Sequence, residues 1–198
     1  DEADDVKKVY TSCHGCIQMC AAVATIENGV VTKELNDVFE YWKEGYVGFL
    51  IGCSFSFEEA LLSAGIPVRH IEQGCNVPMF KTSIPTKQAG PFFGPMVCSM
   101  RPMTPEQARR AYEITAAMPN VHGAPVQIGH PEAIGVADVM KPDYGDPVEI
   151  RPGEVPVFWP CGVTPQAAVE NAKLPLVITH APGHMFIADV KNAELNDY

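Results

Sequence analysis

Residues 94–118, GPMVCSMRPMTPEQARRAYEITAAM, carry the clearest signals of secondary structure in this chain. Its first ten residues are mostly apolar, which predicts a buried strand. Thr104 and Pro105 follow, and these residue types are favoured at the N-cap and the first position of a helix, so a helix is predicted over the remainder. The segment GAPVQIG at residues 123–129 indicates a further strand. Together they predict a β-α-β unit.

The same alternation continues on both sides of this unit. The apolar run at residues 46–51 predicts a buried strand, and residues 55–63 predict an amphipathic helix closed by Gly65. Residues 147–160 read as two strands joined by a tight RPGE turn, followed by a helix over about 165–172 and a strand over 176–179. Alternating strands and helices favour α/β architecture, with ligands at the carboxyl ends of the strands.

Composition narrows the function classes. A formal net charge of −10 argues against nucleic acid and against an anionic membrane surface as partners, since both demand a basic face. No run approaches the roughly 18 apolar residues of a spanning helix. The cysteine count is seven, an odd number that suits free thiols in a reducing compartment. We therefore expect a soluble, cytoplasmic protein that acts on a small molecule and forms either monomers or homo-oligomers.

The N-terminal stretch CHGCIQMCAAVATIENGVVTKE carries Cys13, Cys16 and Cys20 with the spacing C-x2-C-x3-C. Thiolates at this spacing can converge on zinc or an iron–sulfur cluster. Residues around ENG alternate on either side of a two-residue turn signal, which predicts a short hairpin. The stretch resembles the cluster-binding loop of molybdopterin oxidoreductases, although no fourth cysteine follows in the expected context. Unligated thiols on a terminal appendage over residues 1–34 are the alternative.

Six longer segments carry a second and more specific resemblance. In chain order they are FLIGCSFSFEEALLSAGIPVRHI (49–71), NVPMF (76–80), GPMVCSMRPM (94–103), VHGAPVQIG (121–129), GDPVEIRPGEVPVFWPCGVTPQAA (145–168) and ITHAPGHMFIADV (178–190). They are similar to the D-glutamate cyclase family of lyases, whose bacterial members are often called hydro-lyases, over about residues 36–189.

The resemblance implies a fold and a reaction. The expected fold is a mixed-sheet α/β sandwich with two intertwined subdomains in residues 35–198, with an inserted subdomain over about 75–130 as one option. The expected reaction of amino-acid metabolism is removal of water from D-glutamate to give 5-oxo-D-proline. Family members usually carry a further N-terminal region before the FLIGCSFSF segment, and this chain has the cysteine-rich piece there.

Cyclisation of glutamate requires a base, an acid and partners for carboxylates. Arg101, at the end of a predicted strand, is a candidate bidentate clamp for a substrate carboxylate. Two strand-to-helix turns are candidate anion cradles, because backbone N–H groups at helix starts favour negative charge. Ser54 and Ser56 lie at the first turn and Thr164 at the second. Each of these three is equally suited to be a plain N-cap.

The candidate catalytic groups are thiols, imidazoles and one carboxylate. Cys53 and Cys161 occupy corresponding positions at the two turns, where a helix N-terminus is expected to depress a thiol pKa. His180 and His184 lie in the loop THAPGHM and are the preferred general acid and base, while His122 is a candidate substrate contact. Glu154 enters an apolar run, so it is expected to be paired or to have a raised pKa.

Three hypotheses remain open. The first is a lyase acting on a small acidic amino acid, with a divalent cation as one option for a cofactor. The second is an iron–sulfur or zinc binding module that uses Cys13, Cys16 and Cys20. The third is a non-catalytic binding relic of the family. The residues do not distinguish base from acid.

Overall fold

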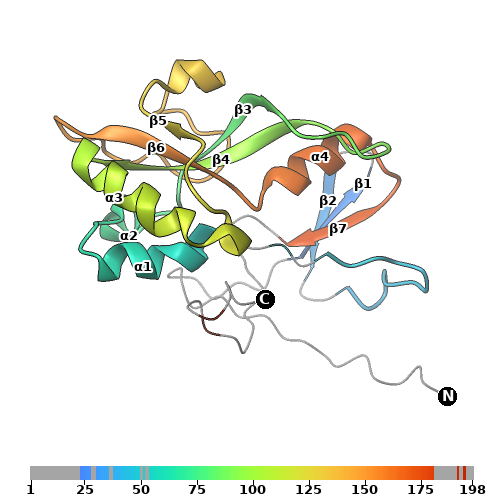
Figure 1. The fold of residues 1–198 in the computed structure, drawn as a ribbon. Coiled ribbons are helices and arrows are strands. Elements are labelled where there is room, and N and C mark those ends of the chain that lie inside the picture. Colours follow the sequence, from blue (N-terminus) through green and yellow to red (C-terminus); the bar gives the residue numbers. More distant parts are fainter. Residues whose placement is uncertain are drawn as a thin grey trace.

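A four-stranded sheet forms the centre of the molecule. The computed structural model describes residues 23–27, 30–35, 38–49, 51, 54–180, 191 and 194. The strands are β3 (Met79–Pro85), β4 (Pro95–Met103), β6 (Val155–Pro160) and β5 (Gln127–Ile128), in the spatial order β3-β4-β6-β5. Helices gather on one face of this sheet, and the short helix that follows β5 lies beyond the other (Figure 1).

Mixed helices and strands confirm the α/β class, but the pairing differs from the expected mixed sheet. Every strand pair among the described residues is antiparallel. β4 and β5 do run in the same direction around the helix between them, as the predicted β-α-β unit requires. However, β6 inserts between them and pairs with both, so no parallel ladder forms in this sheet.

The helices are short apart from one. α3 (Pro105–Ala116) begins with a complete capping box, in which the Thr104 hydroxyl accepts from the Gln107 N–H and the Gln107 side chain accepts from the Thr104 N–H. The predicted N-cap and first helical proline are therefore confirmed. None of the helices in the described parts of the chain is long and apolar enough to cross a bilayer. The others are η1 (Ser54–Phe57), α1 (Glu58–Ser63), α2 (Arg69–Gln73), η2 (Pro119–Val121), η3 (Pro131–Ile134) and α4 (Thr164–Ala172).

A second, three-stranded sheet has the order β2-β1-β7. β1 (Val23–Glu27) and β2 (Val30–Leu35) form the predicted ENG hairpin, and β7 (Val177–His180) pairs with β1. The hairpin thus contacts a strand from the opposite end of the described chain. The division into residues 1–34 and 35–198 stays a prediction.

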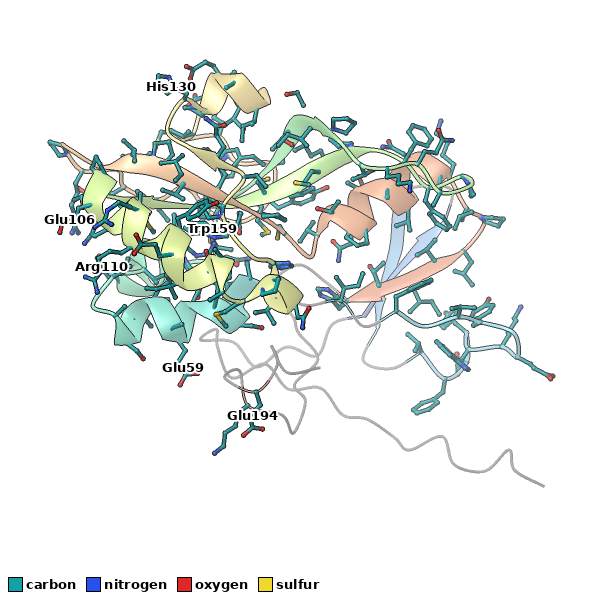
Figure 2. All side chains as sticks on the ribbon, in the orientation of Figure 1. Glu59, Glu106, Arg110, His130, Trp159 and Glu194 are labelled. Carbon is teal, nitrogen blue, oxygen red and sulfur yellow. The ribbon has the colours of Figure 1, made fainter. Side chains whose placement is uncertain are left out.

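Side chains of β4 alternate between two cores. Met103 faces Phe57, Leu61 and Trp159 under the helices, whereas Met100 faces Phe80 and other residues on the opposite face. Figure 2 shows Trp159 between the sheet and the helical layer. Arg101 lies in the same alternating register as Met103, so its side chain enters the helical side of the sheet.

A loop is fastened along β3 by hydrogen bonds on both sides of Gly145. The Met79 N–H donates to the Tyr144 carbonyl at 2.9 Å, and the Asn76 N–H donates to the Asp146 carboxylate at 2.9 Å. Gly145 has a φ of +75°, and a Cβ there would lie 2.0 Å from the Val77 carbonyl oxygen. Only glycine allows the two chain segments to approach this closely.

Two predicted strands are wrong. Residues 46–49 and 51 belong to no strand, and their apolar side chains are exposed, with Phe49 79% accessible. Residues 147–150 are likewise irregular, because this part of the chain follows the loop fastened to β3 and inserts Val148 into the core without strand pairing. In both places the residue types favour a strand, but the segment has no strand partner among the described residues.

Candidate active site

Arg101 is the centre of a buried polar cluster. It is completely inaccessible to solvent. Its Nε and Nη2 donate to a single carboxylate oxygen, Oε1 of Glu58, at 2.8 and 2.5 Å. The guanidinium also lies 4.9 Å from the ring centroid of Phe57 and 5.6 Å from that of Trp159. Ionic, hydrogen-bonding and cation–π contacts therefore fix the guanidinium in one orientation.

Two serine hydroxyls complete the arginine's shell. Arg101 Nη1 donates to the Ser99 hydroxyl at 3.0 Å, and Nη2 donates to the Ser54 hydroxyl at 3.3 Å. The two hydroxyls are 3.3 Å apart, and both residues are buried. Ser54 was predicted as a substrate contact or an N-cap. The helix α1 is instead capped at Phe57, and the Ser54 hydroxyl contacts Arg101.

Glu58 connects this arginine to a histidine. Its Oε1 lies 3.3 Å from Nε2 of His70, which is also buried. Burial by itself would raise the pKa of the Glu58 carboxyl, but the charge of Arg101 and the hydrogen bond with His70 together hold that pKa below its ordinary value. Glu58 is therefore ionised at neutral pH, and its charge compensates the buried guanidinium.

His122 has an uncommon environment at the end of η2. Its backbone is left-handed, with φ of 89°, which costs a non-glycine residue about 1–3 kcal/mol. Its Nε2 is buried without a hydrogen-bond partner among the described residues. Burial lowers the pKa of His122 to about 4, and the positive charge of Arg101 acts in the same direction. At neutral pH this side chain is a neutral imidazole.

Chain topology explains how His122 reaches the cluster. η2 packs against η1, the element that carries Ser54. The strained backbone and the buried, unpartnered nitrogen are found together at one residue. Both features are concentrated at functional sites, where a ligand supplies the missing partner.

Cys161 and Thr164 lie where β6 leads into α4. Burial raises the pKa of the Cys161 thiol, although the Val163 N–H and the charge of Arg101 act in the opposite direction. The expected depression of this pKa is therefore wrong, because burial outweighs the helix start. The Thr164 hydroxyl accepts from the Val97 N–H at 3.0 Å, so it joins α4 to β4. It does not cap α4, whose N-cap is Val163.

Glu154 belongs to a separate ion-pair cluster. Its Oε1 lies 2.6 Å from Nη2 of Arg69, and its Oε2 accepts from the Arg151 N–H at 2.7 Å. Arg69 is buried and also pairs with Glu72 at 3.0 Å. Of the two outcomes predicted for a glutamate entering an apolar run, the structure has the paired one. Neither Arg101 nor His122 is a partner of Glu154 in any of these contacts.

Of the other predicted residues, two are described, and neither is among the contacts of Arg101 named above. His180 is the exposed last residue of β7, and its carbonyl accepts from the Gln166 side chain at 3.0 Å. Ser56 is half-buried in η1. The predicted residues Cys13, Cys16, Cys20, Cys53 and His184 lie outside the described residues.

Sequence reasoning missed Glu58, His70 and Ser99. One signal could have identified Glu58: it occupies a position between Phe57 and Leu61 on the buried side of its helix, where an unpaired charge is costly. His70 and Ser99 offered no comparable signal. Within the described residues, no group of three or more histidine, cysteine or acidic side chains is arranged to hold a metal ion.

Two surface hollows lie elsewhere. One of about 330 Å³ is lined by Lys81, Val136 and Asp143 among others, on the face of the sheet opposite to Arg101. The other, about 410 Å³, lies between the β3–β4 connection and α4, with Phe93 and Asn171 in its lining. Neither hollow is lined by Glu58, Arg101 or His122.

Comparison with known proteins gives consistent matches. The family model described as D-glutamate cyclase matches residues 47–189. "Putative hydro-lyase Bpet2233" of Bordetella petrii is 59% identical over 168 residues, which are 85% of this chain and 64% of that protein. "Putative hydro-lyase" of a Bradyrhizobium species and "Putative hydro-lyase RBAM_004300" of Bacillus velezensis are each 58% identical over 85% of this chain, and over 62% and 64% of their own lengths.

The chain therefore spans less than two thirds of the length of these relatives. The resemblance of the N-terminal cysteines to a cluster-binding loop finds no support in the comparisons. The six segments singled out in the sequence lie almost entirely within the matched region. A model matching well over half of the chain, together with relatives near 58% identity, is sufficient to assign the family. This chain belongs to the D-glutamate cyclase family.

Proposed function

We propose that this protein is a hydro-lyase that removes water from D-glutamate to form 5-oxo-D-proline, with the buried cluster around Arg101 and His122 as its active site. Family membership supports the reaction class. The observation that carries the site is His122, a neutral imidazole whose buried Nε2 lacks a hydrogen-bond partner among the described residues. Such a nitrogen is unprotonated at neutral pH and free of these partners, and the negative charge of a bound substrate would raise its pKa toward the working range of a general base.

In this reaction the role of His122 Nε2 is proton transfer. The substrate α-ammonium must lose a proton before its nitrogen attacks the γ-carboxyl carbon, forming a C–N bond. The nitrogen loses a second proton once this bond has formed, and a C–O bond then breaks as the departing oxygen takes up two protons to leave as water. His122 Nε2 transfers each of these protons in turn from the nitrogen to the leaving oxygen, so the products are the lactam and one water.

Arg101 contributes a fixed positive charge to this site. Nε and Nη2 donate to Glu58, Nη1 donates to Ser99 and Nη2 also donates to Ser54, so the guanidinium is oriented before any substrate arrives. A preorganised cation stabilises the negative charge that develops on the attacked carboxyl group. Its direct bidentate contact with a substrate carboxylate stays a prediction.

An NMR time course with D-glutamate, and separately with L-glutamate, tests the proposal. We expect lactam resonances from the D-form. His122→Asn preserves a residue type that tolerates left-handed backbone. It should reduce the rate about 10²–10⁴-fold, the usual contribution of a general base.

A matched control is available in the same chain. His130 also has positive φ, but its side chain is exposed and pairs with Glu132. His130→Asn should leave the rate unchanged. Binding of D-glutamate without turnover would refute the enzyme and favour the binding relic, and full activity in His122→Asn would refute the site.

A further inference from the structure

Six large apolar side chains are exposed on one short stretch of chain between β2 and η1. We call them the apolar strip, and their accessible fractions run from 37% to 79%. Charged and exposed Glu40, Lys43 and Glu44 lie among them. The strip consists of Phe39, Trp42, Tyr46, Val47, Phe49 and Ile51.

Isolated exposed apolar residues are ordinary, but a contiguous set with charged neighbours marks an interaction surface. Figure 1 shows the segment 38–49, in light blue, projecting from the body of the fold as a loop. The ring of Trp42 packs edge-on against that of Tyr46, with centroids 5.7 Å apart. These two rings contact each other, and both remain exposed in the described fold.

The sequence of this stretch is that of a core element. Residues 46–51 form an apolar run typical of a buried strand, yet none of the described residues pairs with 46–49 as a strand. Sequence and surroundings therefore disagree: the side chains are suited to burial and the described fold does not bury them.

The comparisons indicate what could cover the strip. Each relative extends beyond the matched region by more than half of the matched length, since the match covers only 62–64% of each of them. The family model begins at residue 47, inside the strip. The strip thus lies at the border between the region that this chain shares with the model and what precedes it.

We propose that the apolar strip is a docking surface for apolar polypeptide from the part of a family chain that lies outside the region matched here. This inference does not depend on the proposed activity. The expected occupant is a segment of the D-glutamate cyclase family itself, which packs its apolar side chains against the strip. A second copy of this chain is a competing occupant, and the test below separates the two.

The test uses the intact 198-residue chain and overlapping synthetic peptides that cover the Bordetella petrii relative from end to end. Trp42 is half exposed and Trp159 is completely buried, and they are the two tryptophans of the chain. Acrylamide quenching of fluorescence therefore reports on Trp42. We expect peptides from outside the matched region, and not those from inside it, to bind and to protect Trp42 from quenching.

Val47→Glu combined with Phe49→Glu should weaken this binding at least tenfold, because it places two charges in the contact. Met140→Glu is the control, since Met140 is an exposed apolar residue, 50% accessible, that does not belong to the strip. Circular dichroism checks that both variants fold. Three results would overturn the proposal: no protective peptide, binding unaffected by the strip variant, or a dimer of the chain alone that protects Trp42 and is lost in that variant.

Discussion

At the scale of single residues, Glu58 has the largest structural consequence. One of its oxygens receives two donors from Arg101 and lies within reach of His70. These residues are 43 and 12 positions away along the chain, so no local sequence pattern relates them. Arg101 could be selected from the sequence because it ends a predicted strand. Its carboxylate partner, Glu58, could not, because only the folded chain brings the two residues together.

Replacing Glu58 should leave a buried guanidinium uncompensated. We expect Glu58→Gln to lower the free energy of unfolding by about 3–5 kcal/mol, measured by urea denaturation. Its exposed neighbour provides the control, since Glu59→Gln should change stability by less than about 0.5 kcal/mol. Equal effects of the two substitutions would contradict the importance of the ion pair.

The same carboxylate makes stability depend on acid. The pKa of Glu58 is lower in the folded than in the unfolded chain, so its contribution is fully present above the ordinary glutamate pKa. The contribution is lost as pH falls through the lower folded-state value. Urea titrations at several acidic pH values should therefore show a steeper loss of stability in the wild type than in Glu58→Gln.

His122 should remain neutral well into the acidic range. We expect its ring protons to titrate at a pKa of about 4 by NMR, with the resonance assigned by its absence in His122→Asn. Because the unfolded chain takes up this proton nearer pH 6.5, stability should fall as pH drops from about 6.5 to about 4. Titration of His122 near 6.5 would mean that the imidazole is accessible to water.

At the scale of elements, structures that depend on neighbouring residues were predicted correctly from the sequence. Strand pairings between distant segments were not. The ENG hairpin and the capped helix α3 depend on neighbouring residues, and both are present as predicted. The run at residues 46–51 failed because burial of a strand requires a partner that periodicity alone cannot reveal. Likewise, the insertion of β6 between β4 and β5 is a matter of topology.

Two glycines allow the cost of a left-handed backbone to be distinguished from the cost of a steric clash. Gly145 and Gly153 both have positive φ, but a Cβ at Gly153 would meet nothing within 4 Å, whereas one at Gly145 would collide with the Val77 carbonyl. Gly153→Ala should cost about 1 kcal/mol of stability and Gly145→Ala about 3 kcal/mol or more. Chemical denaturation of both variants measures the difference, and similar losses would show that the loop can move away from β3.

At the scale of the whole molecule, charge governs colloidal behaviour. The net charge is −10 at neutral pH and approaches zero near pH 5.0. Electrostatic repulsion between molecules therefore disappears near this pH, whereas the exposed apolar side chains of the strip do not change with pH.

Light scattering of the purified protein against pH should accordingly pass through a maximum near pH 5. Phe49→Glu should reduce that maximum more than Met140→Glu does, although both substitutions add one negative charge. An equal reduction by the two variants would assign the association to net charge alone.

The ladder between β1 and β7 has a consequence for synthesis in the cell. Val23 pairs with His180, so a strand made early must wait for one made late before this sheet can close. Pairings so distant along the chain close slowly. Because β7 is the last of the described strands to be synthesised, the β2-β1-β7 sheet can be completed only after β7 has emerged from the ribosome, and until then the β1–β2 hairpin lacks this partner.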